Sequence, residues 1–563
     1  MQPSSDLEKT GFSTCNTQEP KSRCSTADPE KDDQKTSSYN LRTSFSSSSL
    51  NNTALSPERI LPCDIEAEGD VGFSSLSCSK TAVSLAPDIP RHPSFEVKFD
   101  ANGEKPQHWP LWYRILIIAA VSFASFIVVI HGTAYTRSMP GMIEEFELKD
   151  LSYATLGMSS YLLGISAGSL VMAPLSEVYG RKVVYIGSLF LYSVFIVPCA
   201  LATTYPQIIV MRFLGAFVGS VTISNTPGTI SDIFDEKYRA LALSSWSLAP
   251  LNGPVVGPLI GGFVAQYLGW RWIYWLLFIM SVISWFLLIF VKETYVPVLL
   301  QRKAARIRKE TGDDRWWCQY DEKLSMTQVL KASIPRPIIL AFTEPILWLW
   351  NAYMSITYAI LYLSFIAYPL IFVDLRGWSQ SIAGLAFLGT GVGNLVAILG
   401  EPLFRRIINS HRKDPETGQV PLEASISILC IASILCPLGQ IWFSCTALPI
   451  NIHWIWPVLA GIPFGAGNCL AMIYSTNYLS NSYGIYAASA IAGNIVMRNV
   501  LGGLLPLSAA AMYAKLGPQW AGTLLGILEI ILIPVPFVFY KWGRKIREKS
   551  SVISRMQLDI HGK

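Results

Sequence analysis

Charged residues are scarce in this chain of 563 residues. Asp, Glu, Lys and Arg together make up 15% of it, whereas 51% is hydrophobic. Its ten cysteines are scattered, with no Cys-x-x-Cys pair and no histidine at a metal-ligating spacing, so we expect buried thiols rather than a disulfide framework or a metal site. The sequence also has no nucleotide-binding loop and no catalytic triad. We therefore expect neither an enzyme nor a bound cofactor.

An apolar signal-peptide core is missing as well. Residues 1–30 are polar, and residues 1–110 are rich in Ser, Thr, Asp, Glu and Pro. Such a segment buries too little apolar surface to fold, so we expect a disordered tail that is either passive or regulated by phosphorylation.

Long apolar runs are abundant, and the mean hydropathy is +0.37. Twelve runs of about 20 residues recur from residue 112 onwards, which is the length needed to cross about 30 Å of hydrocarbon. Backbone groups in lipid must be satisfied within the segment, so each run is expected to be a helix. The sequence therefore predicts an all-α integral membrane protein with twelve transmembrane helices. The expected spans are 112–135, 151–173, 183–203, 207–229, 241–265, 272–291, 340–368, 380–403, 422–444, 453–475, 485–511 and 519–540.

The lysines and arginines between the spans indicate the orientation. If the N-terminus is cytoplasmic, the short cytoplasmic connections hold eight basic residues and the outer connections hold five. Positive charge is concentrated in short cytoplasmic loops, so both termini are expected to be cytoplasmic. The net charge of +5 then reflects topology and gives no reason to expect a nucleic-acid partner. The outer basic residues are Arg137, Lys149, Arg271, Arg376 and Lys515.

A long polar connection divides the spans into two sets of six. A weak repeat supports the division, because "APLSEVYGRK" (173–182) closes span 2 and "EPLFRRI" (401–407) closes span 8. Two pseudo-symmetric six-helix bundles with the substrate bound between them are a recurring transporter plan. The predicted parts are a cytoplasmic tail at 1–110, a bundle at 111–291, a cytoplasmic loop at 292–338, a bundle at 339–541 and a cytoplasmic tail at 542–563.

The fifth span contains "LNGPVVGPLIGG" (251–262), with four glycines and two prolines among apolar residues. A spacing of four places Gly253, Gly257 and Gly261 on one face, where a neighbouring helix can approach closely. The prolines remove backbone donors and allow the helix to bend. A face of small residues alone is explained by helix packing, but the complete pattern of glycines and prolines in 251–262 is a more specific motif.

This run resembles the antiporter motif of the major facilitator superfamily, which the drug:proton antiporters carry. Over about residues 109–541 the chain resembles the fungal twelve-helix drug:proton antiporters. The other stretches that carry the resemblance are "APLSEVYGRKVVY" (173–185), "VMRFLGAFVGS" (210–220), "GWRWIYW" (269–275), "FTEPILWLWNAYMSITYAILYL" (342–363) and "YGIYAASAIAGNIVMRNVLGGLLPL" (483–507). The resemblance assigns the antiporter motif to Gly253, Gly257, Pro258, Gly261 and Gly262.

The same resemblance implies roles for the loop between spans 2 and 3. Gly180 would permit the turn, Arg181 and Lys182 would lie at the cytoplasmic face, and Glu177 would occupy the acidic position. Val178 stands where the family usually has a basic residue, which would loosen the charge network of the loop. Apart from the resemblance, Arg181 and Lys182 are also explained as ordinary positive-inside anchors.

Ionisable side chains inside the spans are costly in lipid, so each is a candidate for proton coupling or charge relay. Arg212, at the family's span-4 arginine, and Arg498 keep their charge and must face a cavity or a partner. Glu344, about one turn into span 7, is either a proton carrier or a solvated glutamate at a helix end. We expect Glu529 to make an interhelical hydrogen bond, and His131 to be structural or to exchange protons.

Aromatic and polar side chains of span 7, with a few from other spans, are candidates for the substrate cavity, because such sites are mostly apolar with few polar groups. Each alone is also explained by packing. The candidates are Asn225, Trp246, Trp350, Asn351, Tyr353, Tyr358, Tyr362, Asn468, Tyr474 and Asn494.

These features predict a secondary transporter that exports small apolar or amphipathic molecules in exchange for protons by alternating access. Drugs, fungicides or secondary metabolites would be its substrates. Two alternatives share the fold: export of polyamines, which needs carboxylates that the spans largely lack, and import of an organic acid, which the arginines would suit. We expect a monomer in the plasma membrane, with an organelle membrane such as the vacuole as the alternative. The bilayer and the small-molecule substrate are its only expected partners.

Overall fold

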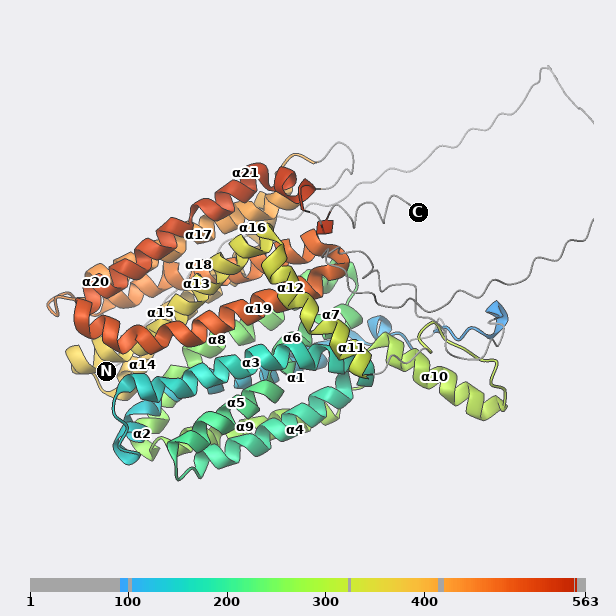
Figure 1. Cartoon of the computed structure of the whole chain (residues 1–563), viewed down its shortest axis with the longest axis horizontal. Helices are drawn as coiled ribbons and strands as arrows, with labels where there is room; N and C mark the ends of the chain where they lie inside the picture. The colour runs from blue at the N-terminus through green and yellow to red at the C-terminus, as the bar shows by residue number, and fades with distance from the viewer. Residues whose placement is uncertain (1–91, 100–103, 322–325, 414–419, 551, 554–563) are drawn as a thin grey trace, which may run out of the picture. The chain divides into compact units, whose positions relative to one another are not determined.

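The computed structural model describes residues 92–99, 104–321, 326–413, 420–550 and 552–553. These ranges are helical and contain no strand; Glu96 and Trp317 form an isolated parallel bridge. Long helices packed side by side make up most of the described part (Figure 1). The all-α fold predicted from the apolar runs is therefore confirmed.

The first bundle consists of the helices before residue 290. Two of its helices, Leu151–Tyr179 and Glu236–Leu268, are longer than the apolar runs alone required, and two short 3-10 helices precede the bundle. The elements are η1 (Pro93–Phe95), η2 (Pro106–His108), α1 (Leu111–Ala134), η3 (Tyr135–Arg137), α2 (Met139–Glu145), α3 (Leu151–Tyr179), α4 (Arg181–Ala200), α5 (Tyr205–Gly219), α6 (Val221–Ser224), α7 (Thr226–Ile233), α8 (Glu236–Leu268) and α9 (Arg271–Ile289).

Three helices form the connection between the bundles, and the remaining helices form the second bundle. The connection comprises α10 (Val296–Thr311), α11 (Met326–Ser333) and α12 (Pro335–Thr343). The second bundle comprises α13 (Pro345–Pro369), η4 (Leu370–Leu375), α14 (Gln380–Leu385), α15 (Leu388–Leu399), α16 (Glu401–Asn409), η5 (Leu422–Ser425), α17 (Ile426–Ala447), α18 (Ile455–Tyr483), η6 (Gly484–Tyr486), α19 (Ala487–Leu504), η7 (Leu505–Ser508), α20 (Ala509–Leu532) and α21 (Pro534–Glu548).

Eleven stretches of the described chain are long and apolar enough to cross a membrane. The last of them, Ala487–Glu548, has 62 residues, about twice the length that one crossing needs. Gly517 has a φ of 76°, a backbone conformation outside the helical region, and it divides this stretch into two helices. The described part of the chain therefore contains twelve helical stretches that are long and apolar enough to cross a membrane.

The termini of the spans depart from the expected positions where proline or polar residues interrupt the helix. The fourth span is divided at Ser220 and Asn225. The seventh span starts at Pro345 instead of residue 340, because Glu344 is non-helical and the residue before a proline is biased away from the helical region. In the segment expected to be disordered, residues 92–99 are ordered: the amide of Val97 donates to the carbonyl of Trp317 at 2.8 Å.

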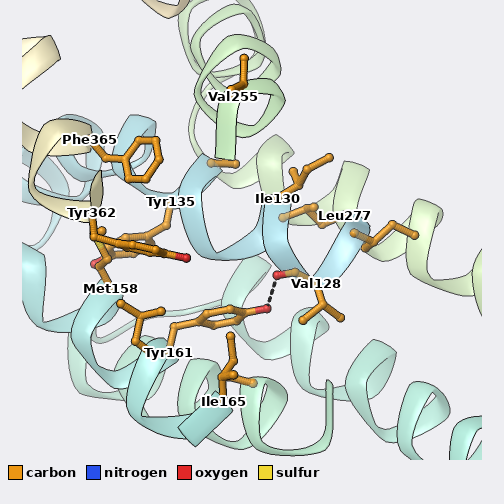
Figure 2. Close-up of a cluster of buried hydrophobic side chains, with 14 of the residues drawn as sticks. Val128, Ile130, Tyr135, Met158, Tyr161, Ile165, Val255, Leu277, Tyr362 and Phe365 are labelled. Atoms are coloured by element: carbon orange, nitrogen blue, oxygen red, sulfur yellow. Dashed lines mark hydrogen bonds between the residues drawn. The ribbon is translucent and has the colours of Figure 1, made fainter. Parts of the chain in front are cut away.

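Alternating directions of the spans define two ends of the bundles. We call the end with the α3–α4 connection the Arg181 end, and the end with the α8–α9 connection the Arg271 end. Helix α3 packs on α19, and α8 packs on α14 and α15, so these helices form the seam between the bundles. The hydrophobic core crosses the seam, because one cluster contains Tyr362 and Phe365 of α13 together with Met158 of α3 (Figure 2).

Candidate functional site

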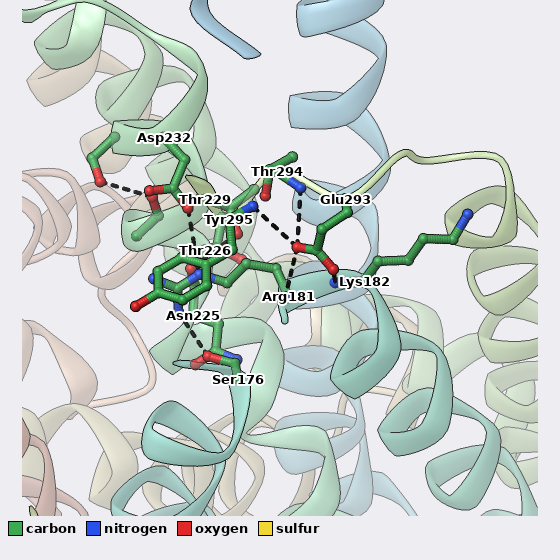
Figure 3. A network of polar contacts seen from close by, with 12 residues as sticks. Ser176, Arg181, Lys182, Asn225, Thr226, Thr229, Asp232, Glu293, Thr294 and Tyr295 are labelled. Carbon is green, nitrogen blue, oxygen red and sulfur yellow. Dashed lines mark hydrogen bonds and ion pairs between the residues drawn. The ribbon is translucent and has the colours of Figure 1, made fainter. Parts of the chain in front are cut away.

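The loop between spans 2 and 3 is held by a buried carboxylate that follows span 6. Gly180, with a φ of 95°, ends α3, and Glu293, 4% exposed, accepts hydrogen bonds from the backbone amides of Arg181 at 2.9 Å and Lys182 at 3.2 Å. Glu293 also accepts from its own neighbours Thr294 and Tyr295 (Figure 3). The carboxylate therefore caps the first turn of α4, where the helix dipole favours negative charge.

The Arg181 side chain extends this network to span 4. Its guanidinium donates to the Ser176 hydroxyl at 2.7 Å, lies 3.5 Å from the Asp232 carboxylate and sits over the Tyr295 ring. Burial raises the pKa of Tyr295 to about 12, so the ring stays uncharged under the cation at physiological pH. Glu177, the acidic residue that the resemblance assigned to this loop, is exposed, whereas Arg181 is buried.

The sequence did not lead us to Asp232 and Glu293, although both are acidic residues at span ends on the side of the basic loop. A buried arginine needs a partner, and that requirement would have pointed to them. Lys182 does not join this network through its amine, which donates to the carbonyl of Ile289 at 2.9 Å. The loop thus joins the ends of spans 2, 3, 4 and 6 at the Arg181 end.

Arg212 lies in the middle of α5 and is 0% exposed. Its guanidinium donates to backbone carbonyls, at 2.8 Å to Gly157 in α3 and at 3.2 Å to His131 in α1, and it sits between the rings of Tyr135 and Tyr161. These contacts join three helices of the first bundle around one cation. Arg212 therefore lies inside the first bundle, behind the seam, and its partners are carbonyls and aromatic rings.

His131 belongs to the same cluster. Its Nδ1 lies 2.9 Å from the Tyr192 hydroxyl, and its ring packs against Tyr161, Tyr192 and Tyr274. Its Nε2 is buried and has no hydrogen-bond partner within the described ranges. His131 therefore packs inside an aromatic cluster of the first bundle, with one ring nitrogen bonded to Tyr192.

The glycine face of α8 packs against α1. A side chain at Gly253 would meet Val129, one at Gly257 would meet Thr133, and one at Gly261 would meet the Ala134 backbone. Helix α8 continues through its prolines without a break.

The opposite side of α8 packs against the second bundle. A side chain at Gly262 would meet the carbonyl of Gln380 in α14, and one at Gly384 would meet the carbonyl of Pro258. The motif residues therefore allow close approach on both sides, to α1 and across the seam.

The candidate residues of span 7 lie on two faces of α13. On the face toward α19 and the seam, the Asn351 side-chain oxygen accepts a hydrogen bond from Asn494 at 2.9 Å, and the Tyr358 hydroxyl donates to that of Tyr362 at 3.2 Å. Arg498 of α19 places its guanidinium 5.3 Å from the centre of the Tyr358 ring. Spacings of seven and four residues put these α13 side chains on one face.

Trp350 and Tyr353 match the packing alternative and do not lie on this face. Trp350 is completely buried and packs on Tyr478 and Phe539, and Tyr353 is buried in the same core cluster of the second bundle. One residue along a helix is a rotation of about 100°, so Trp350 and Asn351 cannot share a face. An apolar span gives no strong amphipathic pattern from which to read this rotation.

Four further candidates have structural partners. Asn225 donates to the carbonyl of Met172 at 3.5 Å, and Asn468 donates to a carbonyl of its own helix. The Trp246 indole donates to Ser125 at 3.1 Å, within the first bundle. The Tyr474 hydroxyl donates to the Glu401 carboxylate at 2.8 Å, at the Arg181 end. Arg498 contacts the Met472 sulfur of α18 at 3.1 Å, on the helix that carries Asn468 and Tyr474.

Two glutamates differ from their expected surroundings. Glu344 is 1% exposed and accepts a hydrogen bond from Ser550 at 2.7 Å, so the solvated alternative is wrong. Glu529 is 3% exposed, and neither carboxyl oxygen has a hydrogen-bond partner in the described chain, so the expected interhelical bond is wrong as well. Close packing of α20 on α17 through Gly522 and Gly526 encloses this carboxyl between the helices.

Hydrogen bonds across the seam lie at the Arg271 end and at mid-depth. At the Arg271 end, Ser159 donates to the carbonyl of Gly503 at 2.6 Å, and the amide of Ser381 donates to Gln266 at 3.0 Å. At mid-depth, Asn394 donates to the carbonyl of Leu251 at 2.8 Å. The bundles are therefore joined at the Arg271 end in this conformation.

Comparison with known proteins agrees with this architecture. The Major Facilitator Superfamily family model matches residues 115–506. The chain is 36% identical over 453 residues to the efflux pump FUB11 of Gibberella moniliformis, covering 80% of this chain and 76% of that one. It is 38% identical over 457 residues to the citrinin biosynthesis cluster MFS transporter mrr1 of Monascus ruber, covering 80% and 90%.

Solved structures share the fold at low sequence identity. The Escherichia coli xylose transporter XylE matches with a TM-score of 0.55 and 15% identity, covering 77% of this chain and 98% of that one. The human organic anion transporter MFSD10 matches with a TM-score of 0.54 and 14% identity, covering 75% and 99%. The chain therefore belongs to the major facilitator superfamily, and it is a multi-pass membrane transporter and not an enzyme.

Proposed function

We propose that this transporter exports small apolar or amphipathic organic molecules, such as drugs, fungicides or secondary metabolites, in exchange for protons. The observation that carries the proposal is the seam cluster of Tyr358, Tyr362 and Arg498, which puts aromatic faces, hydroxyls and one cation between the bundles. Aromatic surface with few polar groups is what such molecules bind. Relatives named as efflux pumps support the direction of transport.

Alternating access would proceed by rocking of the two bundles about the seam. The hydrogen bonds at the Arg271 end would break when that end opens, and the close contacts of Gly262 and Gly384 would separate with them. Helix α8 stays with the first bundle through its glycine face, so it moves as part of that bundle. We infer that both termini and the Arg181 end are cytoplasmic, in the plasma membrane, and that the monomer is the transporting unit.

The proton gradient is the only energy source that the proposal needs, and no cofactor is required. Among the expected coupling residues, His131 and Glu529 retain buried titratable atoms without a hydrogen-bond partner in the described chain. Arg212 and Arg498 act as fixed positive charges, and Glu344 is bound to the C-terminal segment. Mutation of His131 and Glu529 is therefore the first test for the proton carrier.

The seam does not favour a polyamine. A polycation needs carboxylates in its cavity, and Arg498 would repel it. An organic acid would suit Arg498, but the relatives named as efflux pumps support export and not uptake. Export of neutral or weakly acidic molecules is the function that fits both observations.

Counterflow in proteoliposomes tests this function. The purified protein is reconstituted, a pH gradient is imposed, and a panel of dyes, fungicides and metabolites is compared with spermidine and an organic acid. We expect apolar compounds to move faster with the gradient than without it, and an Arg498→Gln variant to change the preference among compounds. If the gradient accelerates no compound, proton antiport is wrong; if spermidine alone responds, the substrate class is wrong.

A further inference from the structure

The chain folds back after α21 and buries three of its next residues. Ser550, Val552 and Ile553 are each at most 7% exposed, although they follow the charged end of α21. Val552 and Ile553 belong to the core cluster of the second bundle, together with Leu340 and Ile346 from either side of the α12–α13 joint. A surface tail has no reason to bury aliphatic side chains, so this segment is docked.

The docking point is the carboxylate of Glu344, which forms the joint between α12 and α13. Glu344 has an extended backbone conformation, with φ −98° and ψ 114°, and Pro345 follows it. Its carboxylate accepts hydrogen bonds from the Ser550 hydroxyl at 2.7 Å and the Val552 amide at 3.4 Å, and from the Tyr483 hydroxyl at 3.5 Å. A buried carboxylate needs such donors, and the C-terminal segment supplies two of them.

The α12–α13 joint lies on the path of the chain that connects the two bundles. Helices α11 and α12 lead from the first bundle into the second: α11 packs on α3, and α12 packs on α19. A change of the relative position of the bundles must be accommodated by non-helical residues along this path, and Glu344 is one of them. Whatever fixes Glu344 therefore fixes part of the path between the bundles.

We propose that Ser550, Val552 and Ile553 form a C-terminal latch, which binds Glu344 and holds the α12–α13 joint, and that negative charge on residue 550 releases it. The bound latch stabilises the present conformation of the joint relative to conformations in which the joint differs. A second anion beside Glu344 would be repelled within a buried site.

Phosphorylation of Ser550 would release the latch in this way. The serine oxygen would gain a phosphoryl group from a nucleoside triphosphate, whose terminal P–O bond breaks to leave the diphosphate, and the hydroxyl proton would be lost. The modification would take place on the undocked segment, because Ser550 is buried when docked. The added charge would then prevent docking.

Thiol labelling of a Val552→Cys variant in the full-length protein tests the docking. The rate of reaction with N-ethylmaleimide is measured by mass spectrometry on the tryptic peptide that follows Lys549. We expect Ser550→Asp to raise this rate at least about tenfold, because a hydrogen bond to a charged group is replaced by repulsion. Adding Glu344→Gln should restore slow labelling, since an amide can bond to the new carboxylate. Ser410→Asp, at an exposed serine, should leave the rate unchanged.

Hydrogen exchange at the joint tests whether docking holds it. The amide of Glu344 donates to Leu340, and that of Trp348 donates to Glu344, each at 3.2 Å. We expect these amides to exchange faster in Ser550→Asp and to return to wild-type rates in the double variant, which also shows that the chain remains folded. Unchanged labelling in Ser550→Asp, or labelling that Glu344→Gln does not restore, would overturn docking. Faster labelling without faster exchange at the joint would overturn the latch.

Discussion

The connections after span 2 and after span 8 occupy matching places in the two bundles, but they are held in different ways. In the first bundle, Glu293 accepts four backbone amides and Arg181 is paired with Asp232. In the second bundle, Glu401 pairs with Arg405 one helical turn away, at 2.9 Å, and both are partly exposed. The repeated Pro-Leu pair therefore marks equivalent positions without equivalent contacts.

The difference arises from the turn. Gly180 stops α3 with a positive φ, which exposes the first amides of α4 to a cap. The position 228 residues further along is Ile408, inside α16, so the eighth span continues into a helix and has no free amides to cap at that point. The first bundle thus holds this turn with Glu293, Arg181 and Asp232, whereas at the same end of the second bundle Arg547 of α21 pairs with Glu423 and Ser550 donates to Glu344.

Arg212→Ala should have the largest effect and would test how strongly the first bundle depends on its buried charges. The change removes a cation that joins three helices and leaves the carbonyls of Gly157 and His131 without their donor. We expect the free energy of unfolding to fall by about 3–5 kcal/mol and transport to be lost. Thermal unfolding in detergent and membrane abundance measure this. An Arg212→Ala protein with wild-type stability would show that the clamp is not structural.

Gly257→Val would test the glycine face that keeps α8 in the first bundle. The added methyl groups would collide with Thr133 and with the α1 backbone, so α8 and α1 must separate. We expect a loss of about 1–3 kcal/mol in the free energy of unfolding, as for other overpacked interiors. The control is Gly187→Val, where the added carbon meets no atom within 4 Å beyond its chain neighbours and the backbone of its own helix. Equal stability of the two variants would contradict the close packing.

Glu293→Gln would test how much the capping carboxylate stabilises the connection after span 2. The amide keeps one acceptor but replaces the other by a donor that faces backbone amides, so part of the cap is lost. We expect the free energy of unfolding to fall by about 2 kcal/mol. Faster hydrogen exchange at the amides of Arg181 and Lys182 would locate the effect, and unchanged exchange there would argue against the cap.

Glu401→Gln is the matched substitution in the second bundle and should have the smallest effect. Its pair with Arg405 is partly exposed, and such pairs contribute less than about 1 kcal/mol. The amide oxygen can still accept from the Tyr474 hydroxyl, so that contact survives. Thermal unfolding compared with Glu293→Gln measures the difference. A larger loss in Glu401→Gln would reverse the comparison.

The apolar runs and the glycine spacing predicted the helices and one close-packed face of α8, because both depend on neighbours along the chain. They could not indicate that Gly262 packs against Gln380, across the seam, rather than against α1. The α13 residues show the same limit. The spacing of Asn351, Tyr358 and Tyr362 is compatible with one face, but only the packed bundle shows that this face is the one at the seam.

The buried charges were the hardest part to predict. The cost of ionisable groups in lipid identified Arg212, Glu344 and Glu529, since composition alone shows where such residues fall. Their partners lie 55 residues away for Arg212 and 206 residues away for Glu344, and no local pattern connects them. Glu529, without a hydrogen-bond partner in the described chain, was the opposite of what sequence suggested.

Twelve membrane-crossing helices follow from the amino-acid sequence, because hydrocarbon requires long apolar segments with internally bonded backbones. The sequence also indicates which spans can pack closely, because glycine spacing is a local property. The face of α13 that borders the seam, the carbonyls that bind Arg212 and the residues that bond to Glu344 follow only from the packing of the bundles. Those outcomes depend on the rotation and contact of helices distant in the chain, and in uniformly apolar spans the sequence carries little information about rotation.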